Sequence, residues 1–267
     1  AVTGDNNVCA GYSAGYDLTD GPGNVLIGRD AGANMTTGDY NIAIGFESAV
    51  AMVGDSDQNI AIGYHALQTE ASGADLCVAI GRNALRVQND ASALNLAIGG
   101  DAGAAITSGT KNVLIGQGAG ETLVDDSENT AVGYQALMTA QSDGNAAFGY
   151  FAGREIGAGV YNTMLGSHAM VNADSEESFN TVVGFAALNQ LDVVDGDHNT
   201  ALGYNAGRYA TASGTTNLTD VRYCTYLGSA SRGSAVTAVE NETSIGYNAT
   251  GQGANSVTLG NADVTDI

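Results

Sequence analysis

The sequence predicts an all-β protein, a parallel β-solenoid of about 15 coils, and three observations lead to this prediction. A block of the form Asn-x-Ala/Leu-Ile/Val/Leu-Gly-x-x-Ala recurs along the 267 residues, almost always at a step of 16 to 19 residues, and such a fixed period is typical of solenoids. Glycine supplies 38 residues, which disfavours helices because an interior glycine costs about 0.5–1 kcal/mol relative to alanine. Large and small side chains alternate within the block, as they do on a β-strand.

The glycine of each block is predicted to form a tight corner at the end of a short strand. The first such glycine is Gly11 and the last is Gly260, so that one repeat domain covers residues 1–267. The corner glycines that we regard as structural include Gly28, Gly45, Gly63 and Gly133. After the corner we expect a second short strand and a polar return turn. Each strand should pair in parallel with its copy in the next coil, about 4.8 Å away.

The two faces of the predicted strand carry different side chains. Large aliphatic residues such as Ile44 and Ile62 precede the glycine, and the residue three positions before the glycine is aliphatic in the first half of the chain and mostly threonine in the second half. We expect this aliphatic face to form the interior of the coil. Alanine and asparagine share the opposite face, which we expect to pack against sister chains in a homotrimer, because two apolar faces cannot both be covered within one thin coil.

The asparagine four residues before the glycine is predicted to have a structural role. Asn41, Asn59 and Asn129 are examples, and stacked amides can hydrogen-bond from coil to coil and satisfy their own donors and acceptors. The threonine column of the second half could form an ice-binding array. Because threonine shares the face of the predicted core, however, we expect its hydroxyl to lie in the interior.

The residue after the corner glycine is frequently aromatic. The column comprises Tyr12, Phe46, Tyr64, Tyr134, Tyr150, Phe185, Tyr204 and Tyr247. Exposed rings would offer a platform for the faces of sugars, whereas covered rings would fill a seam between chains. The seam is the simpler interpretation, and the sequence leaves both open.

Charge and spacing exclude several classes of function. The net charge of −21 disfavours nucleic acid and anionic membrane surfaces as partners, and no apolar run is long enough to be inserted in a membrane. The three cysteines lack metal-site spacing, and His65, His168 and His198 are too far apart along the coils to bind one metal, so we predict no metal, cofactor or catalytic residue. Acidic turns such as Asp55-Ser56-Asp57 could bind calcium weakly, although solvated turns are the simpler interpretation.

The repeat resembles two known groups of fibrous proteins. The run Asn41-Ile42-Ala43-Ile44-Gly45 resembles the head repeat of trimeric autotransporter adhesins, although that repeat is shorter. The run 129–137 is similar to repeats of bacteriophage tail-fibre proteins, in which a segment like 255–263 often precedes an endosialidase-type intramolecular chaperone. The resemblance implies a left-handed β-roll in an intertwined homotrimer, located outside the cell on a virion or a bacterial surface.

We therefore expect a non-enzymatic structural and adhesive fibre module that binds cell-surface glycans by multivalent display. A glycan-degrading tailspike-like enzyme and a self-assembling filament without a receptor are the alternatives. The long step between Gly203 and Gly228 places an insertion at residues 208–223, which is either a binding loop or a passive decoration.

Overall fold

The computed structural model describes residues 4–69, 75–90, 93–173, 176–191, 196–210, 216–235 and 238–265. The chain falls into two compact units, unit 1 (Ala1–Tyr134) and unit 2 (Gln135–Ile267), whereas the repeat alone suggested one domain. In the described residues all regular structure is β, and no helix is present. The predicted all-β class and the parallel β-solenoid are therefore confirmed within each unit.

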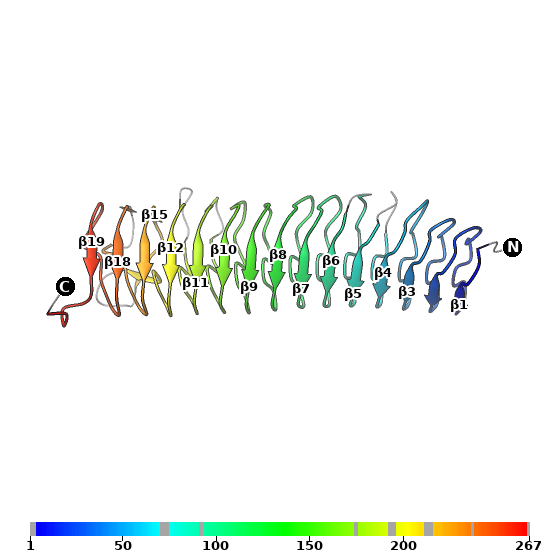
Figure 1. Ribbon diagram of the computed structural model, residues 1–267, viewed down its shortest axis with the longest axis horizontal. Helices are drawn as coiled ribbons and strands as arrows, with labels where there is room; N and C mark the ends of the chain where they lie inside the picture. Colours follow the sequence, from blue (N-terminus) through cyan, green and yellow to red (C-terminus); the bar gives the residue numbers. More distant parts are fainter. Residues whose placement is uncertain are drawn as a thin grey trace. The chain divides into compact units, whose positions relative to one another are not determined.

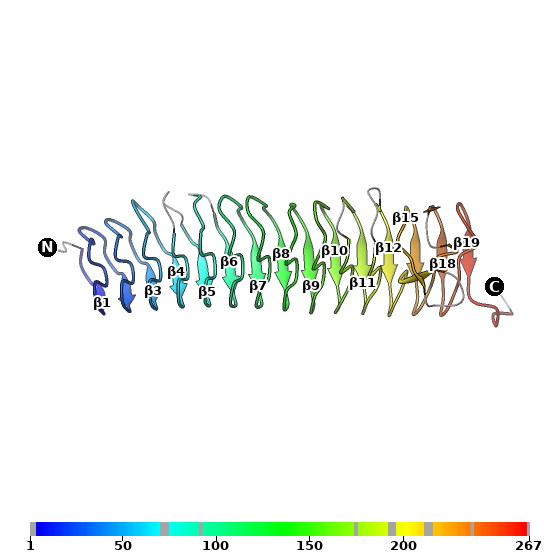
Figure 2. The same ribbon diagram turned by 180° about the vertical axis from the view of Figure 1, so that it is seen from behind.

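Each unit is a stack of coils, and each coil contributes one three-residue strand to a parallel sheet (Figures 1 and 2). Unit 1 contains β1 (Val8–Ala10), β2 (Val25–Ile27), β3 (Ile42–Ile44), β4 (Ile60–Ile62), β5 (Val78–Ile80), β6 (Leu96–Ile98), β7 (Val113–Ile115) and β8 (Thr130–Val132). The main sheet of unit 2 contains β9 (Ala146–Phe148), β10 (Thr163–Leu165), β11 (Thr181–Val183), β12 (Thr200–Leu202), β16 (Thr225–Leu227), β18 (Thr243–Ile245) and β19 (Val257–Leu259). Across the two units, the strands of the main sheets delimit about 13 turns of solenoid. Equivalent residues lie opposite one another, as Ile44 does with Ile62.

The predicted insertion, residues 208–223, adds short strands to unit 2. β13 (Tyr209–Ala210) pairs antiparallel with β14 (Thr216–Asn217). β15 (Val221–Arg222) pairs in parallel with β17 (Val239–Glu240) of the following coil. Residues 211–215 lie outside the described part of the chain.

The corner glycines have a backbone conformation and an environment that exclude a side chain. Gly45 has φ of 138°, and a Cβ atom there would lie 2.4 Å from the carbonyl oxygen of Gly63 in the next coil. Gly28, Gly63 and Gly133 have φ of 134°, 138° and 143°. Only glycine adopts this region without strain, so the corners stack directly upon one another.

The predicted second strand after each corner is wrong, because this segment consists of turns. In the coil of β3, Glu47 and Ala49 have φ of 51° and 50°, and left-handed residues at alternate positions cannot continue an extended strand. The segment still bonds to its neighbour, since the Ala49 N–H donates to the Ala66 carbonyl of the next coil at 2.9 Å. Coils are therefore joined along their turns as well as along their strands.

The prediction of which strand face forms the interior is also wrong. Ala43 and Asn41 are 0% and 1% exposed, whereas Ile42 and Ile44 are only half-buried and point outward. The same holds at β4, where Asn59 and Ala61 lie inside and Ile62 lies outward. The middle strand position points inward and holds alanine in most coils of unit 1 but leucine at Leu26 and Leu114, and the amide and leucine and methionine side chains from the turns complete the interior. The aliphatic residues at the first and third strand positions are left on the surface.

The buried asparagines link the coils through a ladder of hydrogen bonds. The Asn59 backbone N–H donates to Asn41 Oδ1 at 2.9 Å, and the Asn41 N–H donates to Asn24 Oδ1 at 2.7 Å. Asn41 Nδ2 donates to the Ser56 carbonyl in the next coil at 2.7 Å. Asn129 continues the pattern, because its N–H donates to Asn112 Oδ1 at 2.9 Å. Both ends of each amide thus satisfy buried backbone groups, which is a structural role.

Candidate functional site: the outward face of the strands

The outward face of the strands in unit 1 is an uncharged aliphatic surface. It carries the first and third residues of each strand from β2 to β7, and we call these residues the aliphatic face: Val25, Ile27, Ile42, Ile44, Ile60, Ile62, Val78, Ile80, Leu96, Ile98, Val113 and Ile115. All are half-buried except Ile27, which is 38% exposed. Exposed apolar residues usually occur singly, and a contiguous set of them indicates a binding surface.

The corresponding face of unit 2 has threonine at the first strand position. Thr163, Thr181, Thr200, Thr225 and Thr243 follow one another in register on β10, β11, β12, β16 and β18, and we call them the threonine column. The first three are exposed and the last two half-exposed. The expectation that these hydroxyls line the interior is therefore wrong, for the same reason that the aliphatic residues lie outside.

The predicted aromatic column follows the corner glycines along the surface. Tyr12, Tyr64, Tyr134, Tyr150, Phe185, Tyr204 and Tyr247 are exposed, and Phe46 is half-buried. Rings of neighbouring coils stack: the ring centroids of Phe46 and Tyr64 are 5.5 Å apart, and those of Phe185 and Tyr204 are 5.6 Å apart. In these two pairs one face of each ring is covered by its neighbour, so a ligand would meet fewer free ring faces there. This arrangement weakens the interpretation as a platform for sugar faces.

A second aromatic column, which the sequence analysis missed, lies one residue before the buried asparagine position of unit 2, which Cys224 occupies in one coil. Tyr161, Phe179, His198 and Tyr223 stack with centroid separations of 5.6, 5.0 and 5.4 Å. All four are exposed and have positive φ. The available signal was the recurrence of aromatic rings five residues before the corner glycine at Tyr161, Phe179 and Tyr223.

The three histidines all lie in these aromatic stacks. His198 stacks between Phe179 and Tyr223, His168 lies between Tyr150 and Phe185, and the His65 ring is 3.7 Å from that of Tyr64. Among the residues that the structure describes, no three His, Cys, Asp or Glu side chains are grouped so that they could hold a metal ion.

The acidic turns use their carboxylates to bind the neighbouring coil. Asp57 Oδ1 accepts the Asp39 N–H at 2.7 Å, and Asp75 Oδ1 accepts the Asp57 N–H at 2.7 Å. The turn Asp55-Ser56-Asp57, which we considered for calcium, therefore has a structural function for Asp57. Asp55 also accepts a hydrogen bond from the Thr37 hydroxyl at 2.9 Å.

A buried polar cluster lies inside unit 2, where Glu242 occupies the asparagine position. Glu242 Oε1 accepts hydrogen bonds from the Tyr226 hydroxyl at 3.3 Å and the Ser234 N–H at 3.1 Å, and Oε2 accepts the Gly253 N–H at 3.0 Å. Burial raises the pKa of the Tyr226 phenol well above its ordinary value, and burial also raises the pKa of the neighbouring Cys224 thiol. The cluster is enclosed, so it stabilises the coil and offers no reactive group to solvent.

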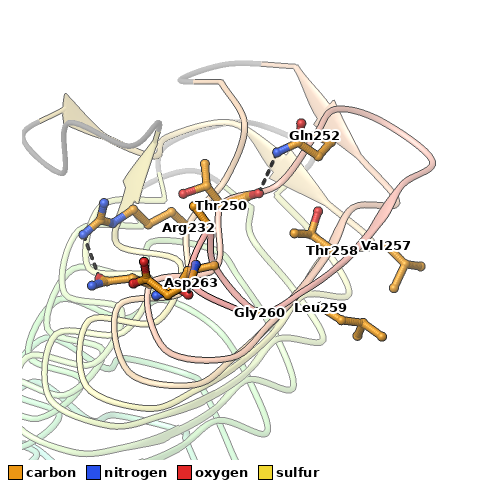
Figure 3. A pocket seen from close by; sticks show the side chains of 11 residues that line it. Arg232, Thr250, Gln252, Val257, Thr258, Leu259, Gly260 and Asp263 are labelled. Atoms are coloured by element: carbon orange, nitrogen blue, oxygen red, sulfur yellow. Dashed lines mark hydrogen bonds between the residues drawn. The ribbon is translucent and has the colours of Figure 1, made fainter. Parts of the chain in front are cut away.

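A cavity of about 730 Å³ opens beside the last described coil of unit 2 (Figure 3). Arg232, Thr250, Gln252 and residues 257–263 line it. The polar side chains bond locally: Arg232 Nη2 donates to Asn248 Oδ1 at 3.0 Å, and Gln252 Nε2 donates to the Thr250 carbonyl at 3.1 Å. No nucleophile lies beside a base among these lining residues.

Comparisons with protein-family models, curated proteins and solved structures find no match for this chain. In the described ranges, none of the secondary structure is a helix of the length and apolarity needed to cross a bilayer. The candidate functional surface is therefore the outward strand face, with its aliphatic residues in unit 1 and its threonine column in unit 2.

Proposed function

We propose that this chain is a structural and adhesive module of an extracellular fibre, which associates as a homotrimer through the aliphatic face of unit 1. The observation that carries the proposal is the outward position of that face. Strand residues 42 and 44, with their equivalents in neighbouring coils, are large, apolar and uncharged. Two or three copies of such a face can cover one another, whereas the alanines expected to do so are buried inside each coil.

The aliphatic face supplies the central part of the proposed subunit contact. Its six strands, β2 to β7, span five coil steps of about 4.8 Å, so the face is about 24 Å long. Tyr40, Tyr64, Leu76 and Leu94 extend the apolar surface beside the strands, since all four are exposed.

Charge is compatible with association through this face. The net charge of −21 opposes contact between copies in general, but none of the twelve residues of the aliphatic face is charged. Repulsion between the acidic turns is screened within about 8 Å at physiological salt. The trimeric state, the left-handed coil and the extracellular location are proposed from the resemblance to adhesin and tail-fibre repeats.

Solution mass tests the proposal with a matched pair of variants. Ile27 on the aliphatic face is 38% exposed, and Val53 in a turn of unit 1 is 37% exposed. If the face is a subunit contact, sedimentation equilibrium should give three times the chain mass for the native protein and for Val53→Lys, and a smaller mass for Ile27→Lys. A native monomer would contradict the proposal. A mass that rises without limit with concentration would favour the filament instead.

A further inference from the structure

We propose that the threonine column of unit 2 binds a neutral, linear polysaccharide that lies along the solenoid axis and whose sugar rings repeat at about the strand spacing. This inference deepens the adhesive part of the proposed function and rests on it. Its starting point is the register of Thr163, Thr181, Thr200 and Thr225, which pair Cα to Cα on consecutive strands β10, β11, β12 and β16. The strands lie side by side in unit 2 (Figure 1), so the hydroxyls repeat at about 4.8 Å.

The hydroxyls of the column are available to a ligand. In the described part of the chain, the side chains of these four threonines and of Thr243 make no hydrogen bond, in contrast to Thr37, Thr107 and Thr139 in the turns. Each hydroxyl can donate one hydrogen bond and accept two. A polymer of hydroxylated rings, repeating at nearly the strand spacing, can therefore bond to one threonine after another.

The side chains that flank the column supply apolar and polar contacts of the kind sugars need. On the N-terminal side of each strand stand the stacked rings of Tyr161, Phe179, His198 and Tyr223. Their exposed edges carry phenolic and imidazole groups. On the other side stand Leu165, Val183, Leu202 and Leu227, which are exposed or half-exposed. A sugar chain that lies on the threonines would thus contact C–H groups and hydrogen-bonding groups together.

Three other occupants are disfavoured. Leucine and aromatic side chains are longer than threonine, so the surface lacks the even height that an ice lattice would require. The aliphatic face of a second copy would leave up to five threonine hydroxyls buried without a partner, which is unfavourable. Acidic polysaccharides are disfavoured because the chain carries a net charge of −21. A neutral polymer with many hydroxyls remains the best fit.

Binding to oligosaccharides of increasing length tests the proposal. We would titrate the full chain with cello-oligosaccharides and, separately, with chito-oligosaccharides of two to six sugars, and measure the affinity by calorimetry. Because four to five threonines are in register, we expect the six-sugar ligand of at least one series to bind at least 10-fold more tightly than the two-sugar ligand. The absence of binding in both series would overturn the proposal.

A double variant separates the hydroxyls from the shape of the surface. Thr181→Val with Thr200→Val keeps the β-branched side chains and gives unit 2 the chemistry of the aliphatic face, so it should weaken six-sugar binding at least 10-fold. Thr130→Val on β8 of unit 1 is the control and should leave binding unchanged. Equal binding by the native protein and the double variant would refute the role of the column.

Solution mass, measured on the same samples, distinguishes this proposal from the proposed trimer. The double variant should keep the native mass. A change in mass without a change in sugar binding would identify the column as a subunit contact and overturn the proposal. If the protein is a trimer that binds no sugar, only the proposed sugar site is contradicted. If it is a monomer that binds sugar, only the proposed trimer is contradicted.

Discussion

Replacing Gly45 by alanine tests whether the coils stack as described. The new Cβ atom would lie 2.4 Å from the Gly63 carbonyl oxygen, at a residue with φ of 138°. Backbone strain in this region costs about 1–3 kcal/mol, and relieving an overpacked contact costs about 1–3 kcal/mol more. We therefore expect Gly45→Ala to lower the free energy of unfolding of unit 1 by about 2–6 kcal/mol.

Gly54 provides the matched control in the same unit. Its φ is 70°, and a Cβ atom there would meet nothing within 4 Å. Gly54→Ala should therefore cost only the left-handed conformation, about 1–2 kcal/mol. Urea unfolding followed by circular dichroism gives both values from the midpoint and the slope. If the two variants lose the same stability, the corner glycines do not stack from coil to coil and the reasoning fails.

Two further predictions concern buried polar groups. Asn59→Ala removes the acceptor of the Cys77 N–H, 2.9 Å away, and should lower the free energy of unfolding in urea by about 2–3 kcal/mol. Asn34→Ala, at an exposed turn residue, is the control and should lower it little. Equal losses would show that the asparagine ladder has no special role. Burial raises the folded-state pKa of Tyr226 above its unfolded value, so its contribution to stability is complete below about pH 10 and is lost as the pH rises through the folded-state pKa. Tyr226→Phe should therefore flatten the alkaline loss of thermal stability, and an unchanged alkaline profile would show that another group is responsible.

Much of the fold could be predicted from the repeat, because a parallel stack forces equivalent residues into register. The spacing of Gly45 and Gly63 was enough to place both at corners, and the recurrence of Asn41 and Asn59 was enough to predict the amide ladder. The conformation of the turns was harder to predict from the sequence. The left-handed residues Glu47 and Ala49 carry no glycine or asparagine signal, so the segment read as a second strand.

The inward and outward faces could not be assigned from hydrophobicity alone. Ile44 is more hydrophobic than Ala43, and that ranking predicts isoleucine inside, but the middle strand position is the inward one whether it holds Ala43 or a larger residue such as Leu114. This error placed the expected subunit contact at the alanines instead of the isoleucines, and it placed the threonine hydroxyls of unit 2 in the interior instead of on the surface. The stack that contains Tyr161 and Phe179 was missed because its positive-φ residues have no common chemical type across unit 1.

Disulfide cross-linking tests the central claim, that the aliphatic faces of sister chains meet. In a Cys9→Ser background, which removes the one exposed cysteine of the described chain, Ile44→Cys is introduced on the aliphatic face and Val53→Cys, separately, in a turn. Each variant is oxidised mildly in its folded state. We expect the Ile44→Cys chains to be covalently joined on a denaturing gel and the Val53→Cys chains to remain single. Equal cross-linking of the two variants, or none at Ile44→Cys, would contradict the account.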